Sequence, residues 1–253
     1  MLSATGNVII LVLVVAAALL FMATVNRFWP LKKRYGRDDL IGWQLETLAT
    51  IQAVVMGFML YTGWTNLQAI RLNIEVEASA LQNLYRLSDG LPSEVRTRVQ
   101  AETLEYAQAA IDGDWPDLAT GRLPEKTHLV NQSMWRTLTR AKVGSPSEAT
   151  ALDQTLSELR NLTQCRRTRL LQSNSHLPGI FWCLLIVGSV LTIISVAMFG
   201  SSIYPLHVFQ VFSLTVLITL AMLTIADLDR PFVGVHVASY PFERALHNLH
   251  ELE

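Results

Sequence analysis

The chain has 253 residues, of which 51% are apolar and only 16% are charged, and its formal net charge is −1. An average soluble domain is about 25% charged, so this composition indicates a protein that lies largely in a membrane. The absence of a basic excess also argues against nucleic acid as a partner, because phosphate binding needs an excess of Lys and Arg.

Four long apolar segments explain the composition, and each is close to the about 20 residues that a helix needs to cross a bilayer. They span residues 8–25, 48–64, 180–199 and 206–226. No basic residue precedes the first segment, which is longer than the about 7–15 apolar residues of a signal peptide, so we expect an uncleaved anchor. Two segments stand on each side of a polar middle, so the whole insert 66–178 is expected on one side of the bilayer.

Charges near the segments give two opposite indications about that side. A short loop after the first segment carries Arg27, Lys32, Lys33, Arg34 and Arg37. The positive-inside rule then makes this loop cytoplasmic and places the insert in the periplasm. Against this, four arginines precede the third segment on the insert side: Arg160, Arg166, Arg167 and Arg169.

The second segment is expected to continue into the insert as one helix over 44–89. Neither Gly nor Pro occurs between Trp64 and Gly90. Apolar residues recur there at helical spacing: Leu67, Ile70, Ile74, Ala78, Leu81 and Leu84. At 1.5 Å per residue the helix is about 70 Å long, well beyond the about 30 Å of hydrocarbon.

The rest of the insert also indicates helices, over 92–111, 125–142 and 145–176. Gly113 with Trp115-Pro116 is expected to end the first, and Ser145 with Glu148 is expected to form a capping box at the start of the third. The insert holds 13 basic and 13 acidic residues, the balance of a soluble domain. The fold class is therefore an all-α membrane protein, with four membrane helices in a two-plus-two arrangement around a helical insert. Its regions are 1–65, 66–178, 179–228 and a C-terminal tail, 229–253, that packs on the insert side; the short stretch 235–239 is the only strand candidate.

No catalytic, cofactor or metal motif is present, so we expect neither an enzyme nor a metalloprotein. His247-x-x-His250 is the nearest approach to a metal pattern, and a solvated helix face explains it more simply. The two cysteines, Cys165 and Cys183, match no metal or redox spacing and are expected to fill space in the core.

One face of the second segment is a candidate pore lining. Glu46, Thr50, Ala53, Gly57 and Tyr61 step by three or four residues, so they share a side of the helix. Ionisable residues in such segments often mark ion pathways. A packing seam of small residues explains Ala53 and Gly57 more simply. For Glu46, an ion-contacting role and simple hydration at the membrane interface are about equally favoured. An aliphatic row on the same helix is the second candidate lining: Val54 or Val55, Phe58 and Thr62.

Two acids follow the fourth segment, Asp227 and Asp229. Acid near a helix C-terminus opposes the helix dipole, so a specific partner is expected. Helix parity puts four arginines on the same side, and Asp229 is expected to pair with one of them: Arg71, Arg166, Arg167 or Arg169. The alternative is that both acids are solvated among the lipid headgroups.

Several stretches resemble the bacterial bestrophin-like membrane proteins. They are Glu77-Ala78-x-x-Leu81-x-x-Leu84-Tyr85-x-Leu87-x-x-Gly90-Leu91-Pro92, Trp115-Pro116, Arg166-Arg167-x-Arg169-Leu170, Leu177-Pro178-x-x-Phe181-Trp182, Leu228-Asp229-x-Pro231-Phe232-x-Gly234 and Pro241-Phe242. The resemblance covers nearly the whole chain. The chain departs from it between the third and fourth segments, where Ser201-Ser202-Ile203-Tyr204 lacks the basic residues that relatives often carry.

This resemblance implies a multi-pass protein of the bacterial inner membrane with kinship to bestrophins, which are pentameric anion channels with a pore lined by the second membrane helix. By that analogy the insert is cytoplasmic, against the indication of the basic loop. The first hypothesis is therefore a homo-oligomeric ion channel in which chloride is a possible substrate. A juxtamembrane arginine ring on the insert side, formed by Arg71 or by Arg166–Arg169 near Asp227 and Asp229, would favour anions, and a Glu46 ring on the other side would favour cations. The second hypothesis is a non-conducting sensor or scaffold whose insert binds a partner.

Overall fold

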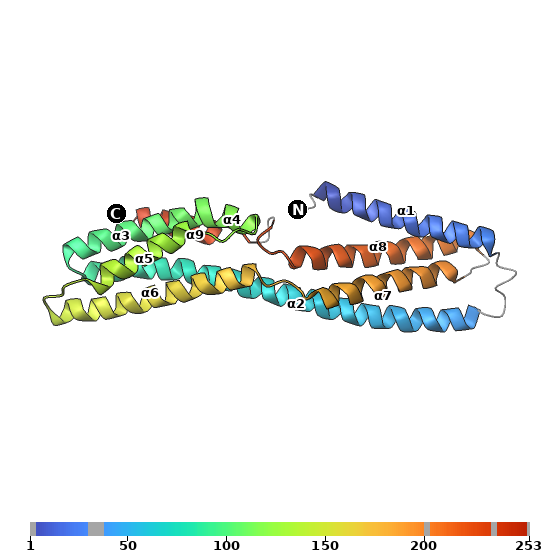
Figure 1. Ribbon diagram of the computed structural model, residues 1–253, viewed down its shortest axis with the longest axis horizontal. Coiled ribbons are helices and arrows are strands. Elements are labelled where there is room, and N and C mark those ends of the chain that lie inside the picture. The colour runs from blue at the N-terminus through green and yellow to red at the C-terminus, as the bar shows by residue number, and fades with distance from the viewer. Residues whose placement is uncertain (1–3, 30–37, 200–202, 234–236, 252–253) are drawn as a thin grey trace. The chain divides into compact units, whose positions relative to one another are not determined.

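The computed structural model describes residues 4–29, 38–199, 203–233 and 237–251, and every regular element in them is a helix (Figure 1). Four helices are long and apolar enough to cross a membrane. The expected all-α fold class with four membrane segments is thus confirmed. Most of the basic loop, Lys32 to Arg37, and residues 235–236 of the strand candidate lie outside the described residues.

The chain divides into two compact units. One consists of residues 1–65 and 176–229 and holds the four apolar segments, and we call it the membrane unit. The other consists of residues 66–175 and 230–253, and we call it the helical unit. Helix α2 (Asp38–Leu87) contributes to both, and its 50 residues correspond to a length of about 75 Å. The predicted continuity of the second segment with the insert is therefore correct.

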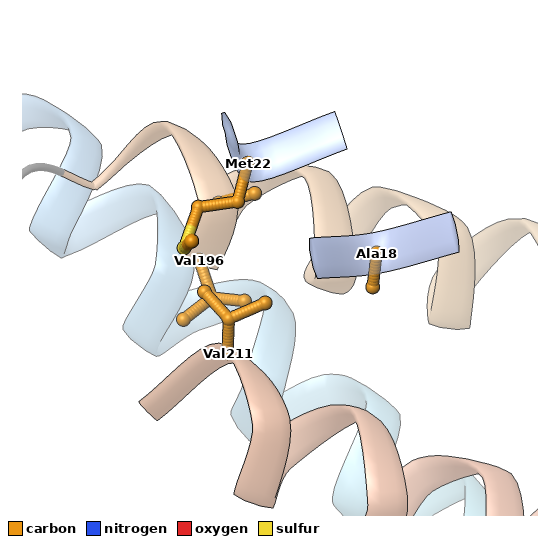
Figure 2. Packing of buried hydrophobic residues seen from close by; sticks show 5 residues of the cluster. Ala18, Met22, Val196 and Val211 are labelled. Atoms are coloured by element: carbon orange, nitrogen blue, oxygen red, sulfur yellow. The ribbon is translucent and has the colours of Figure 1, made fainter. Parts of the chain in front are cut away.

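In the membrane unit, α1 (Ala4–Phe28) packs against α7 (Gly179–Met198) and α8 (Tyr204–Leu228). Their contact is a small apolar cluster in which Met22 of α1 reaches Val196 of α7 and Val211 of α8 (Figure 2). Ala18, one turn earlier on α1, is also buried. A small residue there allows the helix backbones to approach closely, which is how membrane helices gain packing contacts.

The first part of α2 packs on α7 and α8 through both apolar and polar contacts. Met56 joins an apolar cluster with Leu185 and Ile218. Gln52 is buried and its Nε2 donates to the carbonyl of Leu185 at 3.1 Å and to Ser189 Oγ at 3.0 Å. A Cβ at Gly188 would overlap the amide of Gln52, so glycine there is what allows this approach.

The helical unit surrounds the second part of α2. It contains a 3₁₀ turn η2 (Ser88–Gly90), α3 (Ser93–Ala109), a π-helical turn η3 (Ala110–Asp114), α4 (Trp115–Ala119), α5 (Lys126–Thr139), α6 (Pro146–Ser173) and α9 (Tyr240–His250). The apolar stripe predicted on α2 is buried from Leu67 to Leu84. Gly90 is required by packing, because a Cβ there would lie 2.7 Å from the Cβ of Ala151 on α6.

The expected end of the helix after residue 111 is wrong. The chain passes from α3 through the π turn directly into α4. Pro116 lies directly after the π turn, in the first turn of α4, and does not end the helix there. Gly113 serves packing rather than termination, since a Cβ there would lie 3.0 Å from the side chain of Lys126 on α5.

The start of α6 follows the sequence pattern closely. Ser145 Oγ accepts the amide of Glu148 at 3.2 Å, as an N-cap should. The Glu148 carboxylate accepts a hydrogen bond from the amide of Gly144, one residue before the N-cap, at 2.7 Å. Helix α6 ends at Ser173 rather than near His176.

Candidate functional site

The predicted pore face of α2 is exposed along its length. All six of its candidate residues are exposed: Glu46, Thr50, Val54, Gly57, Phe58 and Tyr61. Phe58 and Tyr61 leave 65% and 68% of their surface uncovered. Among the described residues, no atom lies within 4 Å of the position that a Cβ would take at Gly57. Within the described residues, Gly57 is thus not in packing contact with another helix, although it lines an apolar hollow with Thr192 of α7 and Leu214 of α8.

The aliphatic alternative divides between the two sides of α2. Val54 is exposed, whereas Val55 packs against the apolar cluster of the membrane unit. Phe58 and Thr62 lie on the exposed side. Only Val54, Phe58 and Thr62 of this row can therefore face a pathway outside the single chain.

Apart from the buried Gln52, the polar residues at the start of α2 are placed differently from those of α7. On α7, Ser189, Thr192 and Ser195 are all buried, and apolar side chains cover the outside. On α2, Glu46 and Thr50 point outward. Glu46 precedes the apolar segment 48–64, whereas Thr50 lies within it. Ionisable residues at membrane segments often mark ion pathways, so the outer face of α2, which is more polar than that of α7, is the candidate pathway face.

Asp229 follows α8 and connects it to the chain entering α7. Its Oδ1 accepts the amide of Leu177 at 2.6 Å, and its carbonyl lies 3.0 Å from His176 Nδ1. A backbone amide, rather than an arginine, therefore compensates the acid at the end of this helix. Asp227 is exposed.

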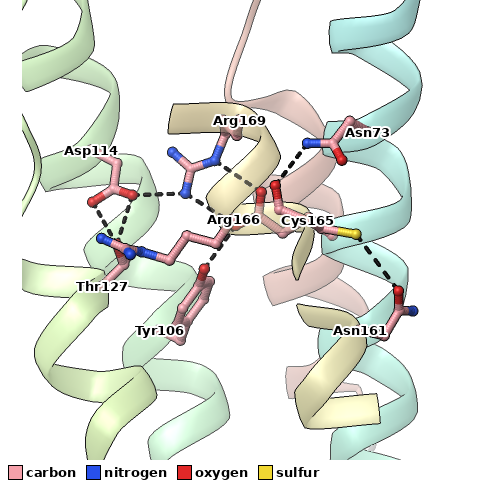
Figure 3. A network of polar contacts seen from close by, with 9 residues as sticks. Asn73, Tyr106, Asp114, Thr127, Asn161, Cys165, Arg166 and Arg169 are labelled. Atoms are coloured by element: carbon pink, nitrogen blue, oxygen red, sulfur yellow. Dashed lines mark hydrogen bonds and ion pairs between the residues drawn. The ribbon is translucent and has the colours of Figure 1, made fainter. Parts of the chain in front are cut away.

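Arg169 differs most from its sequence-based expectation. It is fully buried on α6. Its guanidinium donates two hydrogen bonds to the carboxylate of Glu77 on α2, from Nε at 2.9 Å and from Nη2 at 3.0 Å. The same Nη2 donates to Asp114 of the π turn at 2.7 Å. Tyr106 of α3 donates to Glu77 at 2.7 Å. Glu77 and Asp114, not Asp229, are thus the partners of Arg169 (Figure 3).

A second arginine extends this buried network to α5. Thr127 is buried and its Oγ1 lies 2.9 and 2.7 Å from the two carboxylate oxygens of Asp114. Arg166 Nε donates to Thr127 Oγ1 at 2.9 Å, and Nη2 donates to the carbonyl of Pro124 at 3.1 Å. Side chains from α2, α3, η3, α5 and α6 therefore meet in one network, and bidentate arginine contacts fix its geometry.

Two aromatic rings cover the other side of the Arg169 guanidinium. Its Cζ lies 5.2 Å from the ring centre of Trp115 and 5.9 Å from that of Phe242 on α9, distances typical of cation–π contacts. Trp115 Nε1 donates to the carbonyl of Val237 at 3.1 Å. The rings exclude water from the charges, so each ionic contact is stronger than it would be on the surface.

Burial and the two neighbouring acids shift the pKa of Arg169 in opposite directions. Burial alone would lower its pKa, but Glu77 and Asp114 outweigh burial and hold the pKa above the ordinary arginine value. Burial, and then the charge of Glu77, raise the pKa of Tyr106 well above its usual value. The same two causes raise the pKa of the Cys165 thiol. The network therefore keeps Arg169 charged while Tyr106 stays neutral.

Comparison with known families decides the identity of the chain. The model of the bestrophin-like domain matches residues 12–240. The chain belongs to the bestrophin-like family. No curated protein matches it.

In this bestrophin-like chain the arginines expected to form one juxtamembrane ring have different roles. Arg166 and Arg169 bond to other side chains inside the helical unit. Arg71 on α2 and Arg167 on α6 are exposed.

Sequence reasoning missed Glu77, Asp114, Tyr106 and Gln52. A signal for Glu77 is present, because it interrupts the apolar stripe of α2 between Ile74 and Leu81 at helical spacing. Gln52 gives a similar signal within an apolar segment. Asp114 gives none, because Gly113 and Pro116 beside it are typical of a helix end.

The bestrophin-like chain shows no metal-binding cluster in its described parts. There, no group of three or more His, Cys, Asp or Glu side chains could hold an ion. His247 instead lies 3.5 Å from Glu251, one turn further on, and both are exposed.

Proposed function

We propose that this protein is an oligomeric ion channel of the bacterial inner membrane, in which the outer face of α2 from several copies lines a central pathway. The observation that carries the proposal is the exposure of Glu46 and Thr50 on α2, in contrast to the buried polar residues of α7. Assembly around an axis would remove this face from lipid and place its carboxylate beside water. Kinship with bestrophins suggests five copies.

The pathway would have a polar and an apolar part. Glu46 and Thr50 would form the wider, hydrated part, and Val54 and Phe58 would form a narrow apolar part. Hydrophobic constrictions of this kind gate by excluding water. Gly57, with open space around it, would allow neighbouring copies of α2 to approach closely.

Two exposed sets of charges compete to select the ion. A ring of Glu46 would favour cations, whereas rings of Arg71 and Arg167 in the helical unit would favour anions. Because Arg169 and Arg166 are committed to the interior, the anion-selecting set is smaller than the sequence alone implies. We propose chloride as the first ion to test, on the strength of the family kinship.

Flux through liposomes tests the channel directly. Purified protein is reconstituted, and chloride and potassium fluxes are measured separately after insertion has been confirmed. We expect the flux of one ion to exceed that of empty liposomes, and Glu46→Gln to change the ratio of the two. Absence of both fluxes would overturn the proposal.

Cysteine labelling tests which face lines the pathway. In a Cys183→Ala background, Thr50→Cys on α2 is compared with Val190→Cys on α7, which is exposed and apolar. A charged, water-soluble thiol reagent should block flux through the first variant and leave the second unaffected. Equal block of both, or block of Val190→Cys alone, contradicts a pore lined by α2.

The alternative is a non-conducting sensor or scaffold. A buried ion network that joins five helical elements makes the helical unit a defined, rigid body suited to binding a partner. Oligomeric state separates the two proposals, and native mass spectrometry of the detergent-solubilised protein measures it. A closed ring supports the channel, whereas a monomer or dimer without flux supports the sensor.

A further inference from the structure

The helical unit contains a second polar feature, separate from the buried network. A cavity of about 600 Å³ lies against α3 and α5 and the chain that follows α5. Four basic side chains line it: Arg98, Arg136, Arg140 and Lys142. Its volume falls within the about 300–1,000 Å³ that is usual for small-molecule sites.

The charge at this cavity is concentrated, although the unit as a whole is not basic. Among the lining residues, Glu94 is the one acid beside the four cations. The insert from residue 66 to 178 carries 13 basic and 13 acidic residues. A basic cavity in a neutral unit indicates a compact polyanion, whereas a nucleic-acid strand would need a basic surface extending beyond it.

The basic side chains are only partly engaged by the protein. Arg98 lies 3.5 Å from Glu102, and Arg136 Nη2 donates to Gln132 at 3.3 Å, both contacts within one helix. Within the described chain, Arg140 and Lys142 have no hydrogen bond or ion pair from their side chains. Arg136 lies in the last turn of α5 and Arg140, its C-cap, follows one turn later, so both lie at the C-terminal end of this helix.

The start of α3 adds backbone donors at the same place. Pro92 is its N-cap and gives no side-chain hydrogen bond. Pro92 and Val95, from the first turn, line the cavity. Free amides and the helix dipole at an N-terminus favour phosphate. The C-terminal end of α5 opposes this effect, so the arginines must supply most of the attraction.

We infer that this cavity is a binding site for a soluble small molecule with two or more adjacent phosphate groups. Arginine guanidinium groups match phosphate oxygens with two parallel hydrogen bonds, and three of the four cations are arginines. Thr137 would not contribute a donor, because its hydroxyl is engaged with Glu102 at 3.0 Å. The inference is independent of ion conduction.

Calorimetric titration of the full-length, detergent-solubilised protein with inorganic pyrophosphate tests the site. We expect saturable binding of one pyrophosphate per chain, with an affinity that falls as salt is raised. ATP should bind at the same site, because it presents the same group. Citrate, an anion of similar charge without phosphate, should bind at least about tenfold more weakly.

A charge-matched pair of variants locates the binding. Arg136→Gln combined with Arg140→Gln should weaken pyrophosphate binding by about tenfold or more. Arg96→Gln combined with Arg160→Gln removes the same charge from exposed positions outside the cavity and should leave affinity within about twofold. All four positions are exposed, and circular dichroism confirms that both variants fold.

Three results would overturn the inference. They are no binding of pyrophosphate at low salt, equal loss of affinity in the two double variants, and equal affinity for citrate and pyrophosphate. The second would assign binding to overall charge, and the third would assign it to anions in general rather than to phosphate.

Discussion

The two units of this protein solve the problem of buried polar groups in opposite ways. None of the described Asp, Glu, Lys or Arg side chains of the membrane unit is buried, and Gln52 joins its helices with two neutral hydrogen bonds. The helical unit buries Arg169, Glu77 and Asp114 completely and pairs the one cation with both acids. Water around the helical unit makes apolar burial favourable there, so that unit can tolerate a charged centre. In lipid, van der Waals packing between closely approaching helices must supply more of the stabilisation.

Removal of one buried charge should have the largest effect on stability. Glu77→Gln removes both charge-assisted hydrogen bonds between Glu77 and Arg169 and leaves Asp114 as the remaining acid partner, and should cost about 3 kcal/mol of unfolding free energy. Chemical denaturation in detergent, followed by circular dichroism, measures it.

The control is two residues away on the same helix. Glu75 pairs with Arg244 on the surface, where 44% and 48% of the two side chains are exposed. Glu75→Gln should therefore cost less than about 1 kcal/mol. Similar losses in the two variants would mean that the buried network contributes no more than a surface pair.

Tyr106 gives the helical unit a dependence on alkaline pH. Because its folded-state pKa is raised, its contribution is complete below the unfolded pKa of about 10 and is lost as pH rises above it. Tyr106→Phe removes a hydrogen bond to a carboxylate, and should cost about 1.5–3 kcal/mol at neutral pH. The variant should then lose less stability than the wild type between pH 9 and pH 11, in the same denaturation assay. Parallel pH profiles would contradict this role.

Gly90 tests close packing in the helical unit. Gly90→Ala brings two Cβ atoms to 2.7 Å if nothing moves, and neither can rotate away. We expect a loss of about 1–3 kcal/mol. Ala151→Gly in the same chain should recover part of it, and a double variant no more stable than Gly90→Ala would place the strain elsewhere.

Gly188 makes the matching test in the membrane unit. Gly188→Ala must displace the flexible amide of Gln52, and so break its bonds to Leu185 and Ser189. Neutral bonds between membrane helices average about 0.6 kcal/mol each, so a loss of about 1–2 kcal/mol is expected. Gly179→Ala at the start of the same helix, which meets open space, is the control. Thermal unfolding in detergent should separate the two, and an equal loss from Gly179→Ala would contradict this role of Gly188.

The elements were predictable from the sequence to the extent that they depend on local pattern. The span of α2, the burial of its stripe and the cap at Ser145 follow from periodicity and capping chemistry. The position of Arg169 does not, because its partner Glu77 is 92 residues away and nothing local separates a buried arginine from Arg167 beside it. Sequence position alone therefore predicts one ring of arginines near the membrane. In the structure, Arg166 and Arg169 bond inside the helical unit, whereas Arg71 and Arg167 are exposed.

The π turn at Ala110–Asp114 determines which way the following residues face. A π turn accommodates one residue more than an α turn, and each residue rotates a helix by about 100°. Deleting one residue there would restore an uninterrupted α-helix and swing Asp114 and Trp115 away from the guanidinium that they now contact. The turn is thus equivalent to a one-residue insertion, and the rotation that this insertion adds aligns α4 with the charged centre.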